Sequence, residues 1–108
     1  MLGAAELAAM KPSAYFINVG RGATVDEGAL AAALRARRLA GAAIDVFAQE
    51  PPPAGHPLYS LDNVIVSPHV SGFLPSYDDR CAELFAENLR RYLAGAPLLN
   101  VVDRTMGY

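Results

Sequence analysis

The sequence has 108 residues, of which 53% are hydrophobic, and its nine basic and eleven acidic residues give a net charge of -2 at pH 7. This length suits one small domain or a piece of a larger one, and the composition is that of a globular chain without the basic stripe that a nucleic-acid partner requires. No apolar run reaches the roughly 20 residues needed to cross a bilayer and no signal peptide is visible, so we expect a cytoplasmic protein without membrane contact.

A short helix and a strand are predicted first. Residues 4–10 have helical character, and Pro12 ends this helix because the residue before a proline disfavours the helical backbone region. Residues 14–19 (AYFINV) form a compact apolar run rich in aromatic and β-branched side chains, which is typical of a buried strand.

A second helix and a second strand follow. Asp26 offers a side-chain cap to a helix over residues 27–38, and Gly41 is the expected terminator of that helix. Residues 42–47 (AAIDVF) form the next apolar run, in which Asp45 is the one polar member. This run is predicted to be the second strand.

A proline-rich loop at residues 49–57 and a third strand at residues 63–67 (NVIVS) complete the pattern of strand, helix, strand, long connection and strand. Both connections are long enough for the crossovers that parallel strands need, so we predict an α/β fold with a parallel sheet. The strands are predicted to be buried on both faces, as parallel sheets require. With only one good helix to cover the sheet, apolar faces stay open unless sequence is missing from this chain.

The longest predicted helix covers residues 76–94. Ser76 with Asp79 resembles a capping box at its start, and Gly95 closes it. Its apolar positions recur at helical spacing, so one face is hydrophobic. The tail at residues 97–108 is predicted to be extended or irregular.

Polar residues follow each predicted strand. Arg21 lies between two glycines after the first strand, Asp45 and then Glu50 follow the second, and His69 follows the third. The carboxyl ends of parallel strands share one edge of a sheet, and ligands bind in the crevice there. We therefore expect these four side chains to converge in space.

These residue types suit the reduction of a carbonyl group in an acid substrate. A guanidinium such as that of Arg21 holds a carboxylate by paired, charge-assisted hydrogen bonds. The imidazole of His69 can give or take a proton near neutrality, and a neighbouring carboxylate favours its protonated form.

Each residue also has a simpler interpretation. His69 is at a position where satisfied or surface histidines are common, Arg21 is compatible with an exposed turn, and Glu50 before three prolines is compatible with a solvated loop. Asp45 is different, because an acid near the end of an apolar strand needs a partner or an exit to water.

Several other residues are predicted to have no chemical role, and no metal site is predicted. His56 in the proline-rich loop is predicted to be solvent-exposed. Cys81, the single cysteine, excludes an internal disulfide and is predicted to pack on the apolar face of the last helix. Tyr77, Phe85 and Tyr92 are predicted to belong to a core or an interface.

Three segments resemble a known family in order and content. They are INVGRG ending in VDE (residues 17–27), LAGAAIDVF running to Glu50-Pro51 (residues 39–51), and DNVIVSPH (residues 62–69). Together they resemble the D-isomer specific 2-hydroxyacid dehydrogenases. The ending, LLNVVD to Gly107-Tyr108, is most similar to members near the glyoxylate/hydroxypyruvate reductases.

The resemblance implies a Rossmann-type fold and a role for each strand-end residue. Arg21 would bind the carboxylate and carbonyl of a small 2-keto acid, His69 would donate and accept the proton, and Glu50 would pair with His69. Asp45 would hold the nicotinamide carboxamide of NAD or NADP. The residues expected at the cofactor are Val19, Gly20, Arg21, Asp45, His69 and Gly72.

The resemblance further implies that the chain is the C-terminal half of a Rossmann-type sheet. Residues 1–75 would belong to the NAD(P)-binding domain, and residues 76–108 would be an exit helix and tail belonging with an absent substrate domain. The sequence contains no Gly-x-Gly-x-x-Gly, so the isolated chain is expected to be inactive. The complete enzyme would be a homodimer.

Two other interpretations remain open. Proteins of the same fold can serve as non-catalytic, nucleotide-sensing partners in transcriptional repression, and they can retain these residues. The chain can also be a truncated product or a partial gene sequence.

Overall fold

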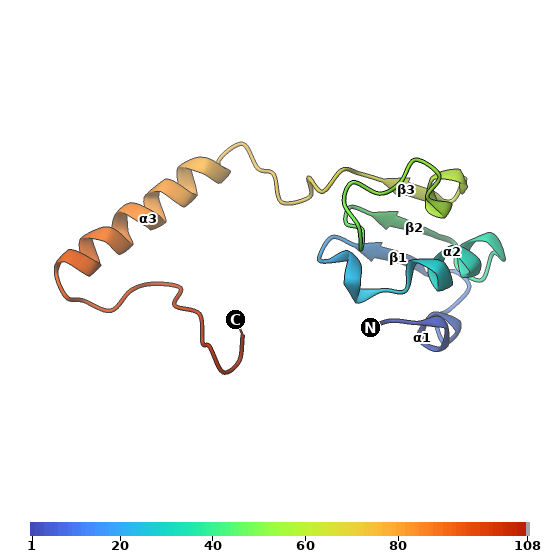
Figure 1. Ribbon diagram of the computed structural model, residues 1–108, viewed down its shortest axis with the longest axis horizontal. Helices are drawn as coiled ribbons and strands as arrows, with labels where there is room; N and C mark the ends of the chain where they lie inside the picture. The colour runs from blue at the N-terminus through green and yellow to red at the C-terminus, as the bar shows by residue number, and fades with distance from the viewer. Residues whose placement is uncertain (108) are drawn as a thin grey trace. The chain divides into compact units, whose positions relative to one another are not determined.

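The computed structural model describes residues 1–107 and divides into two compact units, Met1–Gly72 and Phe73–Tyr108, with Tyr108 itself outside the described residues (Figure 1). The first unit contains the sheet and the shorter helices. The second contains one long helix and the C-terminal tail.

The first unit is built on a parallel sheet of three strands in the order β1-β2-β3 (Figure 1). The strands are β1 (Tyr15–Asn18), β2 (Gly41–Ile44) and β3 (Val64–Val66). Ile17 lies opposite Ala43, which in turn lies opposite Ile65. The predicted α/β class and parallel pairing are confirmed, although each strand is shorter than predicted.

Two helices and two 3-10 turns connect the strands. Helix α1 (Ala4–Ala8) precedes β1, η1 (Gly22–Thr24) and α2 (Glu27–Arg35) lead from β1 to β2, and η2 (Pro57–Ser60) precedes β3. The predicted cap of α2 is confirmed, since the Asp26 carboxylate accepts a hydrogen bond from the Ala29 amide at 2.9 Å. The core is made of apolar side chains from these elements, from the strands and from the connection between α2 and β2, including Leu7, Phe16, Leu30, Leu34, Leu39, Ile44 and Leu58.

The end of α2 differs from the prediction. The helix ends at Arg35 rather than Arg38, and Arg37 adopts a left-handed backbone conformation with φ of 56°. The Arg38 amide then donates to the Ala33 carbonyl at 2.9 Å, a closure that usually employs glycine. Gly41 is not the terminator but the first residue of β2, where a side chain would lie 2.7 Å from the Asn63 carbonyl oxygen.

The prediction that the strands are buried on both faces holds for β2, whose residues are buried or half-buried throughout, but is wrong for β1 and β3. Along β1, Phe16 and Asn18 are buried, whereas Tyr15 and Ile17 are 70% and 66% exposed. On β3, Ile65 is 73% exposed. The core cluster fills one side of the sheet, and the expectation of an open apolar face on the other is confirmed.

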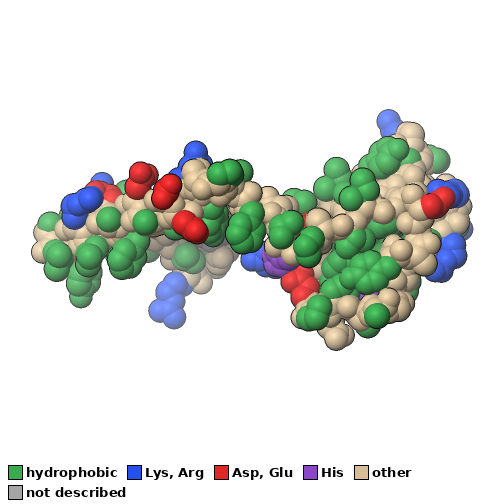
Figure 2. Space-filling model, turned by 90° about the horizontal axis from the view of Figure 1, so that it is seen from above, with side chains coloured by type: hydrophobic (Ala, Val, Ile, Leu, Met, Phe, Trp, Pro, Cys, Tyr) green, Lys and Arg blue, Asp and Glu red, His purple; other side chains and the backbone are tan. Residues whose placement is uncertain are grey.

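The second unit is dominated by α3 (Tyr77–Leu93). Figure 2 shows hydrophobic side chains along one edge of this helix, at the left of the view, and charged side chains along another. No residue of the helix is buried. The apolar side chains, among them Tyr77, Phe85 and Tyr92, are exposed, so they form no core in the described residues and remain candidates for an interface.

Three details of α3 test the predicted ends and the cysteine. Ser76 is at the N-cap but its side chain makes no capping hydrogen bond, so the predicted capping box is wrong. Gly95 closes the helix as predicted, with φ of 65° and the next amide donating to the Arg91 carbonyl at 2.9 Å. Cys81 is exposed rather than packed.

The tail continues as bends and a turn, as predicted for residues 97–107. The Asn88 side chain fixes its start by accepting a hydrogen bond from the Leu99 amide at 2.7 Å and donating to the Leu99 carbonyl at 3.2 Å. None of the helices within residues 1–107 is long and apolar enough to cross a membrane.

Candidate active site

Asp45 follows β2 directly and organises the chain beyond β3. It is 3% exposed, and its carboxylate accepts hydrogen bonds from the Ser67 hydroxyl and from the Val70 and Ser71 amides, both at 2.9 Å. The hydrogen bond from Ser67 is the main reason that the pKa of Asp45 lies well below its usual range, with Ser71 and Val70 adding to it against the opposing effect of burial. The buried acid has therefore found its partners within the protein.

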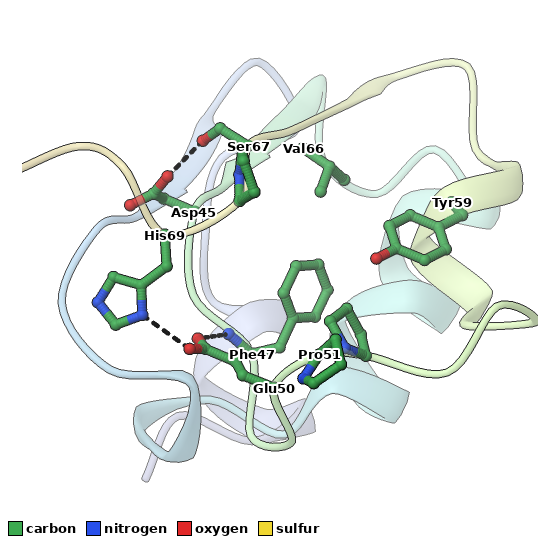
Figure 3. A pocket seen from close by; sticks show the side chains of 10 residues that line it. Asp45, Phe47, Glu50, Pro51, Tyr59, Val66, Ser67 and His69 are labelled. Carbon is green, nitrogen blue, oxygen red and sulfur yellow. Dashed lines mark hydrogen bonds and ion pairs between the residues drawn. The ribbon is translucent and has the colours of Figure 1, made fainter.

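His69 follows β3 and is held by its backbone as well as its ring. Its amide donates to the Asp45 carbonyl at 2.8 Å, and its φ is 54°, in the left-handed region that few non-glycine residues adopt. The imidazole Nδ1 lies 2.7 Å from Glu50 Oε2 (Figure 3). Both side chains are partly exposed, at 50% for His69 and 37% for Glu50, so the pair faces solvent.

Glu50 closes a short loop after β2. Its Oε1 atom accepts a hydrogen bond from the Phe47 amide at 2.9 Å, while Oε2 faces His69 (Figure 3). These contacts, first the hydrogen bond with His69 and then that with Phe47, lower the pKa of the Glu50 carboxyl. The geometry keeps this carboxylate ionised beside a ring that can carry a proton.

Arg21 lies in the segment between β1 and η1, which Asn18 shapes. The side-chain Nδ2 of Asn18 donates to the Arg21 carbonyl at 3.1 Å, and the side-chain Oδ1 accepts from the Gly20 backbone amide at 3.2 Å. The Arg21 guanidinium is exposed and donates to the Gly20 carbonyl at 2.8 Å. Within residues 1–107, no hydrogen bond or ion pair joins the guanidinium to Asp45, Glu50 or His69.

The Arg21 segment nevertheless touches the Glu50 loop through Gly22. This residue is buried, and a Cβ atom there would overlap the peptide group between Phe47 and Ala48. Only glycine allows this close approach of the two backbones. The structure thus brings Asp45, Glu50 and His69 together by direct contacts and places the Arg21 segment against the Glu50 loop.

A pocket of about 530 Å³ opens beside the Glu50–His69 pair (Figure 3). Carboxylate, hydroxyl and imidazole groups lie on one side of it, and the aromatic rings of Phe47 and Tyr59 lie on the other. Such a mixture of apolar wall and few polar groups is typical of small-molecule sites. The lining residues are Asp45, Phe47, Glu50, Pro51, Pro52, Tyr59, Val66, Ser67, Pro68 and His69.

The remaining residues expected at a cofactor are accessible. Val19 is 58% exposed at the carboxyl end of β1, Gly20 follows it, and Gly72 has open space where a side chain would be. No group of three or more His, Cys, Asp or Glu side chains in residues 1–107 is arranged to hold a metal ion.

The prediction for His56 is wrong. Its side chain is 10% exposed, its Nε2 lies 3.2 Å from Glu27 Oε2, and its ring packs edge-on against Phe47 at 5.1 Å between centroids. The loop is rich in proline but folds back onto the first turn of α2, which buries the ring. A loop position alone therefore gave the wrong exposure.

Three further residues were missed by sequence reasoning. Asn18 shapes the Arg21 segment, Ser67 binds Asp45, and Glu27 binds both His56 and the Ala48 amide. A signal existed for Asn18, which is the one polar residue in the run AYFINV. Glu27 has the sequence signature of an ordinary acid in the first turn of a helix.

Comparison with known proteins identifies the family. Residues 1–71 match the model of the D-isomer specific 2-hydroxyacid dehydrogenase, NAD binding domain. The chain is 49% identical over 86 residues to a glyoxylate reductase of Thermofilum pendens, covering 80% of this chain and 25% of that protein. It is 44% identical over 103 residues to glyoxylate/hydroxypyruvate reductase B of Citrobacter koseri, covering 95% of this chain and 32% of that protein. The chain thus spans about a quarter to a third of the length of these relatives.

Solved structures give the same result. A D-isomer specific 2-hydroxyacid dehydrogenase of Xanthobacter autotrophicus Py2, in complex with NADPH and MES, is 47% identical with a TM-score of 0.89, covering 99% of this chain and 43% of that one. An NADPH-dependent glyoxylate/hydroxypyruvate reductase of Sinorhizobium meliloti, in complex with NADP and sulfate, is 32% identical with a TM-score of 0.87, covering 99% and 35%. With its motifs, its parallel sheet and these matches, the chain belongs to the D-isomer specific 2-hydroxyacid dehydrogenase family, through the NAD-binding domain.

Proposed function

We propose that this chain is the C-terminal part of an oxidoreductase that uses NADH or NADPH to reduce a small 2-keto acid, such as glyoxylate or hydroxypyruvate, to a D-2-hydroxy acid. The observation that carries the proposal is the Glu50–His69 pair, 2.7 Å apart, at the carboxyl edge of a sheet belonging to this family. The names of the relatives from Thermofilum pendens and Citrobacter koseri support the substrate class.

His69 is the proposed proton donor to the carbonyl oxygen of the keto acid. Its ring is half-exposed, so a substrate can reach it, and the ionised Glu50 favours the protonated ring that donation requires. In the opposite direction the same ring accepts the proton of the hydroxyl group. Glu50 itself acts through His69.

Arg21 is the proposed clamp for the substrate carboxylate. Its guanidinium is exposed beside the carboxyl end of β1, and its planar fork matches a carboxylate by two parallel hydrogen bonds. Within residues 1–107 its guanidinium donates one hydrogen bond, to the Gly20 carbonyl, which leaves other donors available for a substrate.

The residues present fit the nicotinamide half of the cofactor. When bound, NADH or NADPH supplies the hydride for the reduction. Asp45 Oδ2 accepts one amide, from Ser71, and so retains acceptor capacity for the carboxamide of the nicotinamide. Val19, Gly20 and Gly72 are open enough to lie against the ring.

The proposal extends to the architecture of the complete protein. Residues 1–75 would belong to the NAD(P)-binding domain, and residues 76–108, with the exposed apolar face of α3, would join a substrate domain. We place the complete enzyme in the cytoplasm as a homodimer. Sedimentation analysis of the complete protein tests the oligomeric state.

The test begins with the genomic reading frame upstream of Met1. An in-frame Gly-x-Gly-x-x-Gly would supply the pyrophosphate-binding loop of a complete enzyme. The complete protein is then assayed by the absorbance of NADH and of NADPH with a panel of small 2-keto acids, glyoxylate and hydroxypyruvate included. We expect turnover of at least one member, with His69→Ala as the inactive comparison.

If the complete protein folds and binds the cofactor but turns over no 2-keto acid, the proposed enzymatic function is rejected. That result would then favour the non-catalytic nucleotide-binding protein as its function. An upstream frame without the glycine motif would instead identify the chain as a truncated product.

A further inference from the structure

Glu27, the first residue of α2, binds the backbone of the loop that carries Glu50. Glu27 Oε1 accepts a hydrogen bond from the Ala48 amide at 2.6 Å, one residue after the Phe47 amide that binds Glu50. The Glu27 side chain is 18% exposed, whereas Ala48 lies at the surface. The two carboxylates therefore bind consecutive amides of the same short loop.

The second oxygen of Glu27 is occupied by His56. Nε2 of His56 lies 3.2 Å from Glu27 Oε2, and its Nδ1 accepts a hydrogen bond from the Leu58 amide at 3.4 Å. Because Nδ1 accepts, the ring proton lies on Nε2 and is donated to Glu27. The His56 ring also packs against Phe47 and Tyr59, at 5.1 Å and 5.9 Å between centroids.

We infer that the Glu27–His56 pair is a positioning device for Glu50, holding the Phe47–Glu50 loop so that the Glu50 carboxylate meets the ring of His69. The inference rests on the proposed function, because it assigns importance to the Glu50–His69 contact. In residues 1–107 neither Glu27 nor His56 is hydrogen-bonded to His69, so their proposed effect on His69 passes through the Glu50 loop.

The surroundings of His69 and His56 explain why we assign them different roles. His69, which is half-exposed, is faced by the Glu50 carboxylate and lies next to Asp45, whose carbonyl binds its amide. The His56 side chain is only 10% exposed, and the charged group facing it is Glu27. We therefore assign His69, which is half-exposed, the role of proton carrier, and His56, which is 10% exposed, the role of hydrogen-bond donor to Glu27.

The experiment measures the protonation of His69 without any enzyme activity. The chain is treated with diethyl pyrocarbonate, which reacts with neutral imidazole, at low concentration over a range of pH. Modification of the peptide carrying His69 is then quantified by mass spectrometry. Because two of the variants lack His56, far-UV circular dichroism of every variant serves as the common check that the chain is folded.

Glu50→Gln, Glu27→Ala and His56→Phe are compared with the parent chain. We expect each to raise the rate at which His69 is modified at a fixed pH, because each weakens the contact between the ring and the Glu50 carboxylate. His56→Phe keeps the ring packing but loses the donor, whereas His56→Gln keeps a donor and should restore the parent behaviour in part. Asp62→Asn, which removes the exposed carboxylate paired with Arg37, is the matched control without effect.

The decisive variant is Glu27→Ala combined with Glu50→Gln. If Glu27 acts through Glu50, the double variant matches Glu50→Gln alone, because the two substitutions share one route to His69. A full additional increase in the modification rate of the double variant, or parent behaviour in both Glu27→Ala and His56→Phe, overturns the positioning role. No increase in Glu50→Gln itself would reject the pairing that the proposed function requires, which is a distinct result. If Glu27→Ala unfolds the chain, His56→Phe and His56→Gln provide the test instead. An effect of His56→Phe that His56→Gln reverses in part shows that the hydrogen bond to Glu27, rather than the packing of the ring, positions the loop.

Discussion

Asp45 fixes His69 from two sides: its carbonyl oxygen binds the His69 amide at 2.8 Å, and its carboxylate binds the amides of the next two residues, each at 2.9 Å. These contacts hold His69 at a φ of 54°, a backbone conformation that costs energy for a residue with a side chain. A strained backbone persists only where its surroundings determine it, and Asp45 provides those surroundings. The residue proposed to hold the cofactor therefore also sets the direction of the proposed proton donor.

Replacing Asp45 by Asn should destabilise the segment around His69 in a pH-dependent way. The pKa of Asp45 is lowered in the folded chain, mainly by the Ser67 hydrogen bond, so its contribution to stability is present above its unfolded pKa of about 4 and is lost as pH falls through the folded value. We expect Asp45→Asn to unfold at a lower urea concentration than the parent at pH 7, with a smaller difference at pH 3. Asp78→Asn in α3 is the control. An equal difference at both pH values would contradict the assignment.

Replacing Glu50 by Gln should change the pH dependence of the complete enzyme. In the proposed mechanism the protonated ring of His69 donates to the substrate, and losing the carboxylate that contacts it disfavours that form, so kcat/KM should fall at a lower pH on the basic side of the profile. Each unit of displacement lowers the rate about tenfold at pH values above that limb. The pH profile of kcat/KM with saturating cofactor tests this, and an unchanged basic limb would remove Glu50 from the mechanism.

Replacing Arg21 by Lys should weaken both substrate binding and turnover. Lysine keeps the charge but loses the planar fork that binds a carboxylate with two hydrogen bonds. The expected loss in kcat/KM corresponds to about 2–5 kcal/mol, the cost typical of removing one partner from a desolvated charge pair. Steady-state kinetics of the complete enzyme provide the measurement. A variant with parent kcat/KM would support the interpretation of Arg21 as an exposed turn residue.

Replacing Gly22 by Ala should displace the Glu50 loop, because the new Cβ would overlap the peptide between Phe47 and Ala48. The Cβ is fixed directly to the backbone of residue 22 and the atoms it would meet are backbone atoms, so the overlap can be relieved only by a backbone shift. We expect a loss of about 1–3 kcal/mol or more in the free energy of unfolding. Gly55→Ala is the matched control, since open space surrounds that position. Urea denaturation of both variants tests the contrast, and equal stability would show that the loop adapts freely.

The chain of 108 residues, purified alone, should bind NADH weakly and associate with itself. Its sequence has no Gly-x-Gly-x-x-Gly, and Ile17 and Ile65 project from an open sheet face. Calorimetric titration with NADH and size-exclusion chromatography are the measurements. The double variant Ile17→Ser, Ile65→Thr should associate less. A monodisperse parent chain that binds NADH in the micromolar range would place the main cofactor site within these residues.

The sequence was sufficient for the α/β class, the parallel pairing and the expectation that acids and a histidine meet at one edge. Those inferences depend on local patterns, namely apolar runs and the polar residues that follow them. The closure of α2 was not predictable, because Arg37 takes a conformation for which glycine is the usual signal.

The exposure of individual side chains was harder to predict, because it depends on contacts between distant segments. His56 is buried by Glu27, which precedes it by 29 residues, and no local pattern records that contact. Ile17 and Ile65 have the apolar character of buried strand residues, yet their face of the sheet is open in this chain. The Arg21 segment meets the Glu50 loop through a glycine whose sequence context gives no sign of a crossing.

That crossing at Gly22 has a consequence for how the site would meet a ligand. The backbone at Gly22 packs directly against the peptide between Phe47 and Ala48, and the same loop carries Glu50, which contacts the ring of His69. The main-chain positions of Arg21 and of the Glu50–His69 pair are thus set relative to one another by contacts within the folded chain. Such preorganisation removes the entropic cost of assembling the groups at the moment of binding.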